Sequence, residues 1–301
     1  MNGAGSVLRA PMRSLRGWHD AKLAGPLRND RVECVCGAAR KNIPGHMWRV
    51  SDKEDDPFFP KYYYRCPDCS SFSAPQIYFP ADKYETLALE FYGKGEKTDV
   101  LTEVRVGSML HALCGEPRDP LLLDLGSGGG WLSRRFVGSV AGGRALAVDA
   151  DTRLRDVYYQ ADRDIEFVPE LIDEFLEGFG DEVARGERVG ADAAIMTDVL
   201  EHLIWPDATV ELVMRALRPG GVGYFVVPNS RTFQVPEPFP VPASAVEWGH
   251  AKHTCQHIWT MSPEAFESIF VRAGFTLLSH DQDVETQIRR DAVFSTVIVR
   301  R

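Results

Sequence analysis

Residues 121–130 read Leu-Leu-Leu-Asp-Leu-Gly-Ser-Gly-Gly-Gly, an apolar run that passes directly into a glycine-rich loop. A continuous apolar run that ends in glycines is typical of a buried strand in a parallel sheet. Glycine lets the chain turn tightly and lets a ligand approach the backbone closely. A helical stretch follows, and the first N–H groups of a helix lack partners within it. The stretch therefore predicts a ligand-binding strand–loop–helix unit.

The spacing of the glycines indicates the kind of ligand. A dinucleotide-binding loop needs glycines in the pattern G-x-G-x-x-G, and here the third position falls at Trp131. The pattern is instead D-x-G-x-G-x-G, with Asp124 two residues before Gly126. A carboxylate at the end of the strand suits a ligand with a positive charge better than a pyrophosphate.

A second apolar run, 145–149, ends in Asp149, about 20 residues past the loop. An acidic residue at this place accepts hydrogen bonds from ribose hydroxyls in related sheets. A ligand with a ribose, a cationic end and no phosphate describes S-adenosylmethionine.

Strand and helix patterns alternate through the rest of the chain. Further strands are predicted at 165–168, 191–196, 223–227, 275–279 and 293–300. A helix over 208–217 ends at the breaker sequence 218–221, and another begins at the N-cap Ser262 with Pro263 and ends before Gly274. This alternation predicts an α/β fold with a doubly wound, seven-stranded Rossmann-like sheet.

The ordered motifs resemble the class I S-adenosylmethionine-dependent methyltransferases over about residues 119–301. The matching segments are the loop 124–130, Asp149, residues 197–203 after the fourth strand, residues 217–221 before the fifth and residues 227–229 after it. The resemblance implies methyltransferase activity (EC 2.1.1.-). It also implies a cofactor site of Asp124, Gly126, Ser127, Gly128, Gly130, Asp149, Ala150, Asp198 and Val199, with the glycines on the methionine part and Asp149 on the ribose.

Candidate catalytic residues follow the fourth strand. Glu201 and His202 are expected at the carboxyl edge of the sheet, where ligands bind. A hydroxyl or carbon acid acceptor needs a base, and an ordinary histidine pKa of about 6.5 suits His202 to that role. A purely structural role for the Glu-His pair remains the alternative, and whether a base is needed is open.

A second histidine group lies in the Pro-rich and aromatic insert 230–261, which contains His250, His253, Cys255 and His257. In related methyltransferases this region covers the active site and shapes the acceptor pocket. We expect one of these histidines to line the acceptor site, and His257 is the candidate and the third predicted catalytic residue. Metal binding by the group is the alternative, although its spacing fits no standard zinc motif.

Four of the six cysteines form two pairs, Cys34-x-Cys36 and Cys66-x2-Cys69. Four thiolates on two turns predict a structural, tetrahedral zinc site. The first pair is one residue shorter than the usual C-x2-C, and four reduced thiols with packing roles are the alternative. The layout resembles the zinc modules that precede bacterial sugar C-methyltransferases and their relatives in polysaccharide and antibiotic clusters. It also resembles zinc-bearing ribosomal RNA methyltransferases.

The composition divides the chain and weighs against some partners. The predicted segments are a basic, flexible lead over 1–30, a β-rich zinc-ribbon-like module over 31–80, a helical linker or lid over 81–113, and the methyltransferase domain over 114–301. The basic lead loosely resembles a transit peptide but lacks the apolar core of a secretory signal.

A net charge of −9 disfavours nucleic acid as a partner. No apolar run is long enough to cross a membrane. Without a secretory signal we expect a reducing cytoplasm, where clustered thiols act as metal ligands.

The expected function is methyl transfer to a small-molecule or glycan-type acceptor such as a sugar, a nucleotide-sugar or a natural product. The alternatives are a zinc-containing RNA methyltransferase and a non-catalytic cofactor-binding or scaffold protein of the same fold. The sequence leaves the acceptor, the methylated atom and the oligomeric state open.

Overall fold

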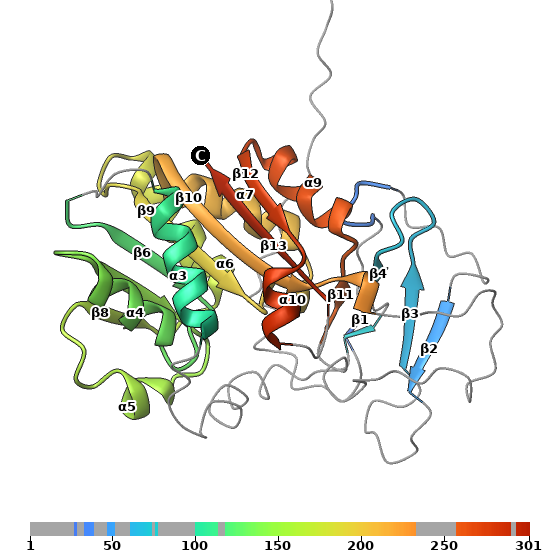
Figure 1. Ribbon diagram of the computed structural model, residues 1–301, viewed down its shortest axis with the longest axis horizontal. Coiled ribbons are helices and arrows are strands. Elements are labelled where there is room, and N and C mark those ends of the chain that lie inside the picture. The colour runs from blue at the N-terminus through green and yellow to red at the C-terminus, as the bar shows by residue number, and fades with distance from the viewer. Residues whose placement is uncertain are drawn as a thin grey trace, which may run out of the picture.

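A seven-stranded sheet forms the centre of the protein (Figure 1). The computed structural model describes residues 27–28, 33–38, 47–51, 61–73, 76–77, 100–113, 118–232, 257–289 and 293–301. The strands of the sheet are β6 (Leu121–Leu125), β7 (Arg144–Val148), β8 (Ile165–Val168), β9 (Ala191–Thr197), β10 (Leu217–Pro228), β12 (Thr276–Asp281) and β13 (Phe294–Arg300). Their order is β12-β13-β10-β9-β6-β7-β8.

The strand order confirms the doubly wound prediction. Strands β6, β7, β8, β9 and β10 pair in parallel, and β13 pairs antiparallel with both β10 and β12. The chain winds outward from β6 to β8 and then returns to β9 on the other side of β6. In open sheets, ligands bind outside the carboxyl ends of the strands where the order reverses. The loops after β6, β7 and β9 meet at that place.

Helices cover both faces of the sheet, because alternate side chains of each buried strand face opposite layers. One layer contains α3 (Val100–Ala112), α4 (Trp131–Ser139), α5 (Leu154–Tyr158) and α10 (Val284–Arg289), and the other contains α6 (Ile172–Ala184), α7 (Pro206–Ala216) and α9 (Pro263–Ala273). Leu122, Ile195 and Tyr224 pack in the first layer, while Leu123 and Phe225 pack in the second.

Both predicted helices are present, and the first is shifted at both of its ends. Helix α7 begins at Pro206 rather than at residue 208 and ends at Ala216, and Leu217 already pairs with Ala191, so the predicted breaker 218–221 lies in an irregular part of β10 where the register shifts. The start of α9 is confirmed, because Ser262 Oγ accepts a hydrogen bond from Ala265 N at 3.1 Å. The C-cap Gly274 adopts a φ of 95°, which favours glycine.

The cysteine region is β-rich and extends into the rest of the protein. Strands β2 (Met47–Ser51), β3 (Lys61–Arg65) and β4 (Phe72–Ser73) pair antiparallel, and β11 (Trp259–Thr260) completes their sheet at the β4 edge. A short pair, β1 (Leu27–Arg28) with β5 (Gln76–Ile77), is separate. Because β11 comes from the far end of the chain, the cysteine module is joined to the methyltransferase domain by strand pairing.

Some predicted features lie outside the described residues. These are most of the basic lead 1–30, the first half of the helical linker 81–113, and His250, His253 and Cys255. Among the helices that are described, none has the length and apolar character needed to cross a membrane.

Candidate functional site

The glycine loop after β6 has a conformation that only glycine adopts without strain. Gly126, Gly128 and Gly130 have φ values of 78°, 49° and 74°. A Cβ added to Gly126 would lie 2.4 Å from Cγ2 of Val199, so a larger residue has no room there. Two of the predicted cofactor residues, Gly126 and Val199, are therefore in contact across the switch point between β6 and β9.

Asp124 is buried at the end of β6 and holds the start of α4. Its Oδ2 atom accepts hydrogen bonds from Ser133 N at 3.2 Å and from Ser133 Oγ at 2.7 Å. Burial raises the pKa of Asp124 from its ordinary value of 3.8 to about 6, and these hydrogen bonds oppose that rise. The sequence did not point to Ser133, which carries no motif of its own.

An Asp124→Asn variant is expected to flatten the pH dependence of stability. A carboxyl with a raised pKa binds its proton more tightly in the folded state. Its contribution is therefore complete below about pH 3.8 and is lost as the pH rises through about 6. For the wild type, this group alone lowers the free energy of unfolding by about 2 kcal/mol between about pH 4.5 and pH 7. Urea denaturation across that range measures the slope.

The control for this comparison is Asp164→Asn, which changes an exposed carboxyl. Asparagine at position 124 still offers an oxygen to Ser133, so the difference between wild type and variant isolates the titration. Parallel stability profiles for the wild type and Asp124→Asn would show that Asp124 does not titrate with a raised pKa.

Asp149 joins the loop to the following strand. Its Oδ2 accepts from Gly128 N and its Oδ1 from Asp151 N, both at 3.0 Å. Burial raises the pKa of Asp149 above its ordinary value, and these two N–H groups oppose the rise. Each carboxylate oxygen can accept a second hydrogen bond, so Asp149 retains acceptor capacity for a ligand hydroxyl. Ala150, also a predicted cofactor residue, follows Asp149 directly.

Two aromatic residues that the sequence motif did not indicate, Tyr159 and Trp131, border the glycine loop. The Tyr159 hydroxyl donates to Ser127 Oγ or Gly128 O, each 3.0 Å away. Trp131 Nε1 is buried and has no hydrogen-bond partner among the described residues. An unpaired buried donor beside glycines that leave the backbone open fits a polar ligand. The residues present thus suit S-adenosylmethionine.

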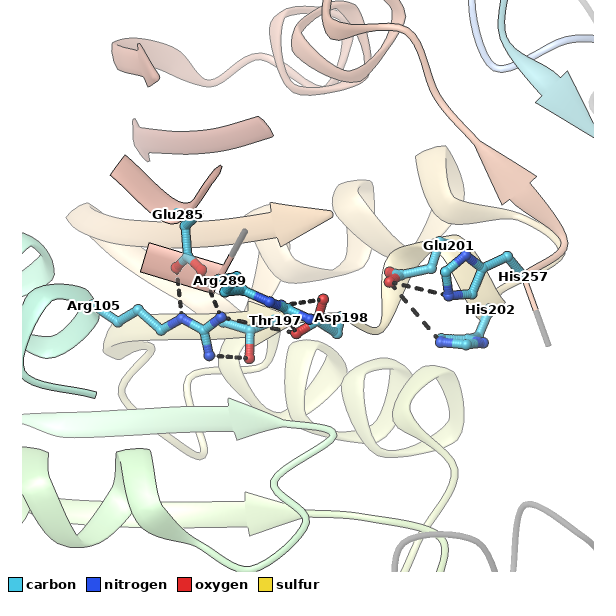
Figure 2. Close-up of polar contacts among 8 residues, drawn as sticks. All are labelled: Arg105, Thr197, Asp198, Glu201, His202, His257, Glu285 and Arg289. Atoms are coloured by element: carbon cyan, nitrogen blue, oxygen red, sulfur yellow. Dashed lines mark hydrogen bonds and ion pairs between the residues drawn. The ribbon is translucent and has the colours of Figure 1, made fainter. Parts of the chain in front are cut away.

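Asp198 lies in a network of charged side chains at the end of β9 (Figure 2). It has a φ of 57°, and its carboxylate oxygens accept from Arg289 of α10 at 2.6 and 2.8 Å. Arg105 of α3 lies 3.8 Å from Asp198 and makes two hydrogen bonds, at 2.7 and 2.9 Å, to Glu285. Arg105 also lies 3.4 Å from the Thr197 hydroxyl. The network ties α3 and α10 to the predicted cofactor residue Asp198.

The three predicted catalytic residues come together. Nε2 of His202 and Nε2 of His257 each lie 4.0 Å from Oε1 of Glu201, and the two rings meet edge to face at 4.8 Å (Figure 2). Glu201 and His202 belong to η2 (Leu200–His202), directly after β9. Glu201 is fully buried, and neither of its carboxylate oxygens has a hydrogen-bond partner in the described part of the chain.

Burial and nearby charge raise the pKa of Glu201, and a backbone hydrogen bond positions His257 beside it. Burial raises the pKa of the Glu201 carboxyl well above its ordinary value, and the charge of Asp198 raises it further. Ile258 N donates to the backbone oxygen of Glu201 at 2.8 Å, which places His257 against η2. This hydrogen bond holds His257 next to His202, although the two are 55 positions apart in the sequence.

The four predicted zinc ligands also converge. Sγ of Cys34 lies 3.6 Å from Sγ of Cys69, and Sγ of Cys36 lies 3.8 Å from Sγ of Cys66, with all four within 4.8 Å. A tetrahedral ion with Zn–S bonds of about 2.3 Å separates its sulfurs by about 3.8 Å. The short C-x-C spacing is no obstacle, because Gly37 turns the chain with a φ of 88°.

Hydrogen bonds within the cysteine cluster separate its thiol pKa values. The thiol of Cys34 donates to Cys69, which lowers the pKa of Cys69 to about 5 and raises that of Cys34. Burial raises the pKa of Cys36 to about 11. The cluster also packs inward, because Cys34 and Cys66 are buried in the same core as Trp259.

Comparison with solved structures found similar proteins of low sequence identity. The [4+2]-cyclase SpnF is similar at 11% identity and a TM-score of 0.50, over 73% of this chain and 94% of that one. The 1,6-didemethyltoxoflavin-N1-methyltransferase of Burkholderia thailandensis has 15% identity and a TM-score of 0.49, with 83% and 97% covered. The N-methyltransferase NodS of Bradyrhizobium japonicum WM9 has 14% and 0.48, with 72% and 98% covered. A search of curated proteins gave no significant match.

The family is defined by sequence rather than by these structures, since one fold supports different reactions. The model of the "Methyltransferase domain" family matches residues 103–280, which is more than half of the chain. The chain therefore belongs to this family, whose fold and glycine loop are those of the class I S-adenosylmethionine-dependent methyltransferases.

Proposed function

We propose that this protein binds S-adenosylmethionine at the loop 126–130 and Asp149 and methylates a small-molecule or glycan-type acceptor. The observation that carries the proposal is the hydrogen bond from Gly128 N to Asp149 Oδ2 at 3.0 Å, which holds the glycine loop beside the carboxylate at the end of β7. Asp149 would accept from the ribose hydroxyls, and Ser127 and Gly128 would border the methionine part. When bound, the cofactor supplies an electrophilic methyl group on its sulfonium.

The chain's own residues would orient the two reactants. Asp124 holds the first turn of α4 and so fixes the loop on which the cofactor rests. Val199, which contacts Gly126, and the adjacent Asp198 would border the same site just after β9. Alignment of the acceptor with the sulfonium methyl is itself a large part of the rate advantage. His202, with Glu201 and His257 beside it, would accept a proton from an acidic acceptor group.

Charge favours a small acceptor over RNA. The net charge of −9 works against binding of a polyanion, because phosphate contacts require clustered Lys and Arg. A glycan or natural product needs only a few placed polar groups and apolar walls. RNA remains the second candidate, supported by the thiol cluster that some RNA methyltransferases share.

An Asp149→Ala variant is expected to bind S-adenosylmethionine at least tenfold more weakly than the wild type in isothermal titration calorimetry. A hydrogen bond to a charged group contributes about 1.5–3 kcal/mol, so losing one from the ribose corresponds to roughly a tenfold to hundredfold change. The milder Asp149→Asn variant keeps one acceptor oxygen and should fall between the two.

Asp164→Ala provides the matched control, since it removes an exposed carboxylate before β8 and should leave the affinity unchanged. Absence of binding by the wild-type protein at millimolar cofactor would reject the proposed function. Equal affinities for the wild type and Asp149→Ala would instead reject the role of Asp149 alone.

We also propose that Cys34, Cys36, Cys66 and Cys69 bind one structural zinc ion. The support is the sulfur separations of 3.6 and 3.8 Å, which are close to the edge of a tetrahedral Zn–S4 site. The ion would join the two thiol turns to the core near Trp259, and its role would be stability rather than catalysis.

A further inference from the structure

We propose that Glu201, His202 and His257 form a second metal site, for a divalent first-row cation, beside the proposed methyl-transfer site. One carboxylate and two imidazoles form a ligand set suited to Zn²⁺, Mn²⁺ or Fe²⁺. The site is separate from the thiol cluster, because it contains no sulfur and follows β9 rather than β3.

The three ligand atoms lie somewhat farther apart than they would around a bound cation. The Nε2 atoms of His202 and His257 each lie 4.0 Å from Oε1 of Glu201, and one ligand atom from each residue lies within 4.8 Å of the others. In a bound site, metal–ligand bonds of about 2.0–2.2 Å to nitrogen and oxygen place neighbouring ligand atoms about 3.0–3.5 Å apart. Small rotations of the two rings, which border the surface, would close the difference. At 4.0 Å the carboxylate and the rings are too far apart for direct hydrogen bonds.

Burial of Glu201 is the second observation. Its side chain is 1% exposed, and both oxygens lack a hydrogen-bond partner among the residues that the structure describes. A buried ionised carboxylate is costly unless a cation or hydrogen-bond donors compensate its charge. Arg289 is engaged by Asp198 at 2.6 Å. A divalent ion between Glu201 and the two imidazoles would supply the compensation.

The fold holds the three ligands in place. Ile258 N donates to Glu201 O at 2.8 Å, and Trp259 Nε1 donates to Ile204 O at 3.3 Å, so the segment after His257 is attached to the segment after β9 at two points. Preorganisation of this kind is what a metal site requires of its ligands.

The position of the site indicates which acceptor group the cation would bind, and this step rests on the proposed function. Val199, which contacts the glycine loop, precedes Glu201 by two residues. Three protein ligands leave coordination positions open, as in catalytic metal sites. The acceptor chemistry that fits an open position near the methyl group is an oxygen-bearing small molecule, whose hydroxyl or carbonyl would bind the cation directly. With Nε2 of His202 bound to the cation, that ring would not itself be the base, and the cation would instead lower the pKa of the bound hydroxyl.

Metal content measures the site without any assay of activity. Full-length protein is dialysed to equilibrium against micromolar Zn²⁺ and Mn²⁺, and the bound metal is counted by mass spectrometry. We expect the total for His257→Ala and for His202→Ala to be about one ion per chain below the wild type. Glu201→Gln, which keeps the shape and removes the charge, should weaken binding at least tenfold in a Mn²⁺ titration of the same protein.

The matched control is His280→Ala. His280 also contacts a carboxylate, with Nδ1 2.9 Å from Oε2 of Glu267, but among the described residues no second histidine joins that pair. Its metal content should equal that of the wild type. Circular dichroism of each variant confirms that the fold is retained, and His257→Asn serves as a replacement where alanine unfolds the protein.

The outcomes separate the two proposals. Equal metal content in the wild type, His202→Ala and His257→Ala overturns the metal site, even where S-adenosylmethionine binds. Loss of about one ion in these variants supports the site, even where the wild type fails to bind S-adenosylmethionine and the proposed function is rejected.

Discussion

The Cys66→Ser/Cys69→Ser variant is expected to lose about one zinc ion per chain and with it the fold of the cysteine module. In zinc-finger peptides the binding of structural zinc contributes about 10–16 kcal/mol, which is folding free energy because no preformed site exists in the unfolded chain. Here the effect should extend further, because Cys34 and Cys66 share a core with Trp259 and β11 pairs with β4. We therefore expect a lower melting temperature for the methyltransferase domain as well.

The measurement combines metal analysis with thermal denaturation. The control is Cys114→Ser/Cys255→Ser, which removes the two cysteines outside the predicted site and should keep the zinc content. Unchanged zinc in the Cys66→Ser/Cys69→Ser variant would reject this site. Loss of zinc without any change in melting temperature would show that the ion has no structural role.

Glu285→Gln is expected to destabilise the protein by about 3–5 kcal/mol, because it removes one partner of a buried ion pair. Arg105 and Glu285 have side chains 11% and 1% exposed and are joined by two hydrogen bonds at 2.7 and 2.9 Å. The variant leaves the guanidinium buried beside Thr197 and Asp198 without the counter-charge of Glu285. Urea denaturation at neutral pH measures the change.

The chain offers a matched control in Glu187→Gln. Arg185 and Glu187 also form two hydrogen bonds, at 2.9 and 2.8 Å, but both side chains are more than half exposed. Solvent screens such a pair, so its removal should leave the stability unchanged. Equal effects of the two substitutions would contradict the argument from burial. A double variant, Arg105→Leu/Glu285→Leu, should be more stable than Glu285→Gln because it leaves no unpaired charge.

The same network connects stability to the cofactor site. Arg105 and Arg289 converge on Asp198, which has a φ of 57°. Helices α3 and α10 thus hold the end of β9 in a conformation that a non-glycine residue adopts only when its surroundings support it. We infer that loss of Glu285 also weakens the support of Asp198 and Val199.

Much of the fold follows from local sequence patterns. Strand-length segments predicted all seven strands of the sheet, although β10 begins at Leu217 rather than at residue 223. The central strands are apolar runs because a buried strand packs side chains on both of its faces, whereas β12 at the edge is largely exposed. Ser262 with Pro263 predicted the start of α9, because capping is a contact between residues three apart. The glycine loop and Asp149 were also predictable, since the positive φ values and the position at a strand end depend on adjacent residues.

Contacts between residues far apart in the sequence could not be predicted from local patterns. Arg105 and Glu285 are 180 residues apart, and each is an ordinary charged residue within a helical pattern. No sequence signal indicated that Tyr159 would lie on the glycine loop or that Ser133 would hold Asp124. These contacts depend on which helix faces meet, and that is decided by the packing of whole elements.

The sequence by itself determined the doubly wound sheet, the glycine loop and the membership of this chain among the methyltransferases, because these depend on periodicity and on motifs of a few adjacent residues. Tertiary structure alone decided that His257 joins Glu201 and His202, and that β11 completes the sheet of the cysteine module. The physical reason is that the Ile258–Glu201 hydrogen bond and the β4–β11 pairing exist only after distant segments have packed together.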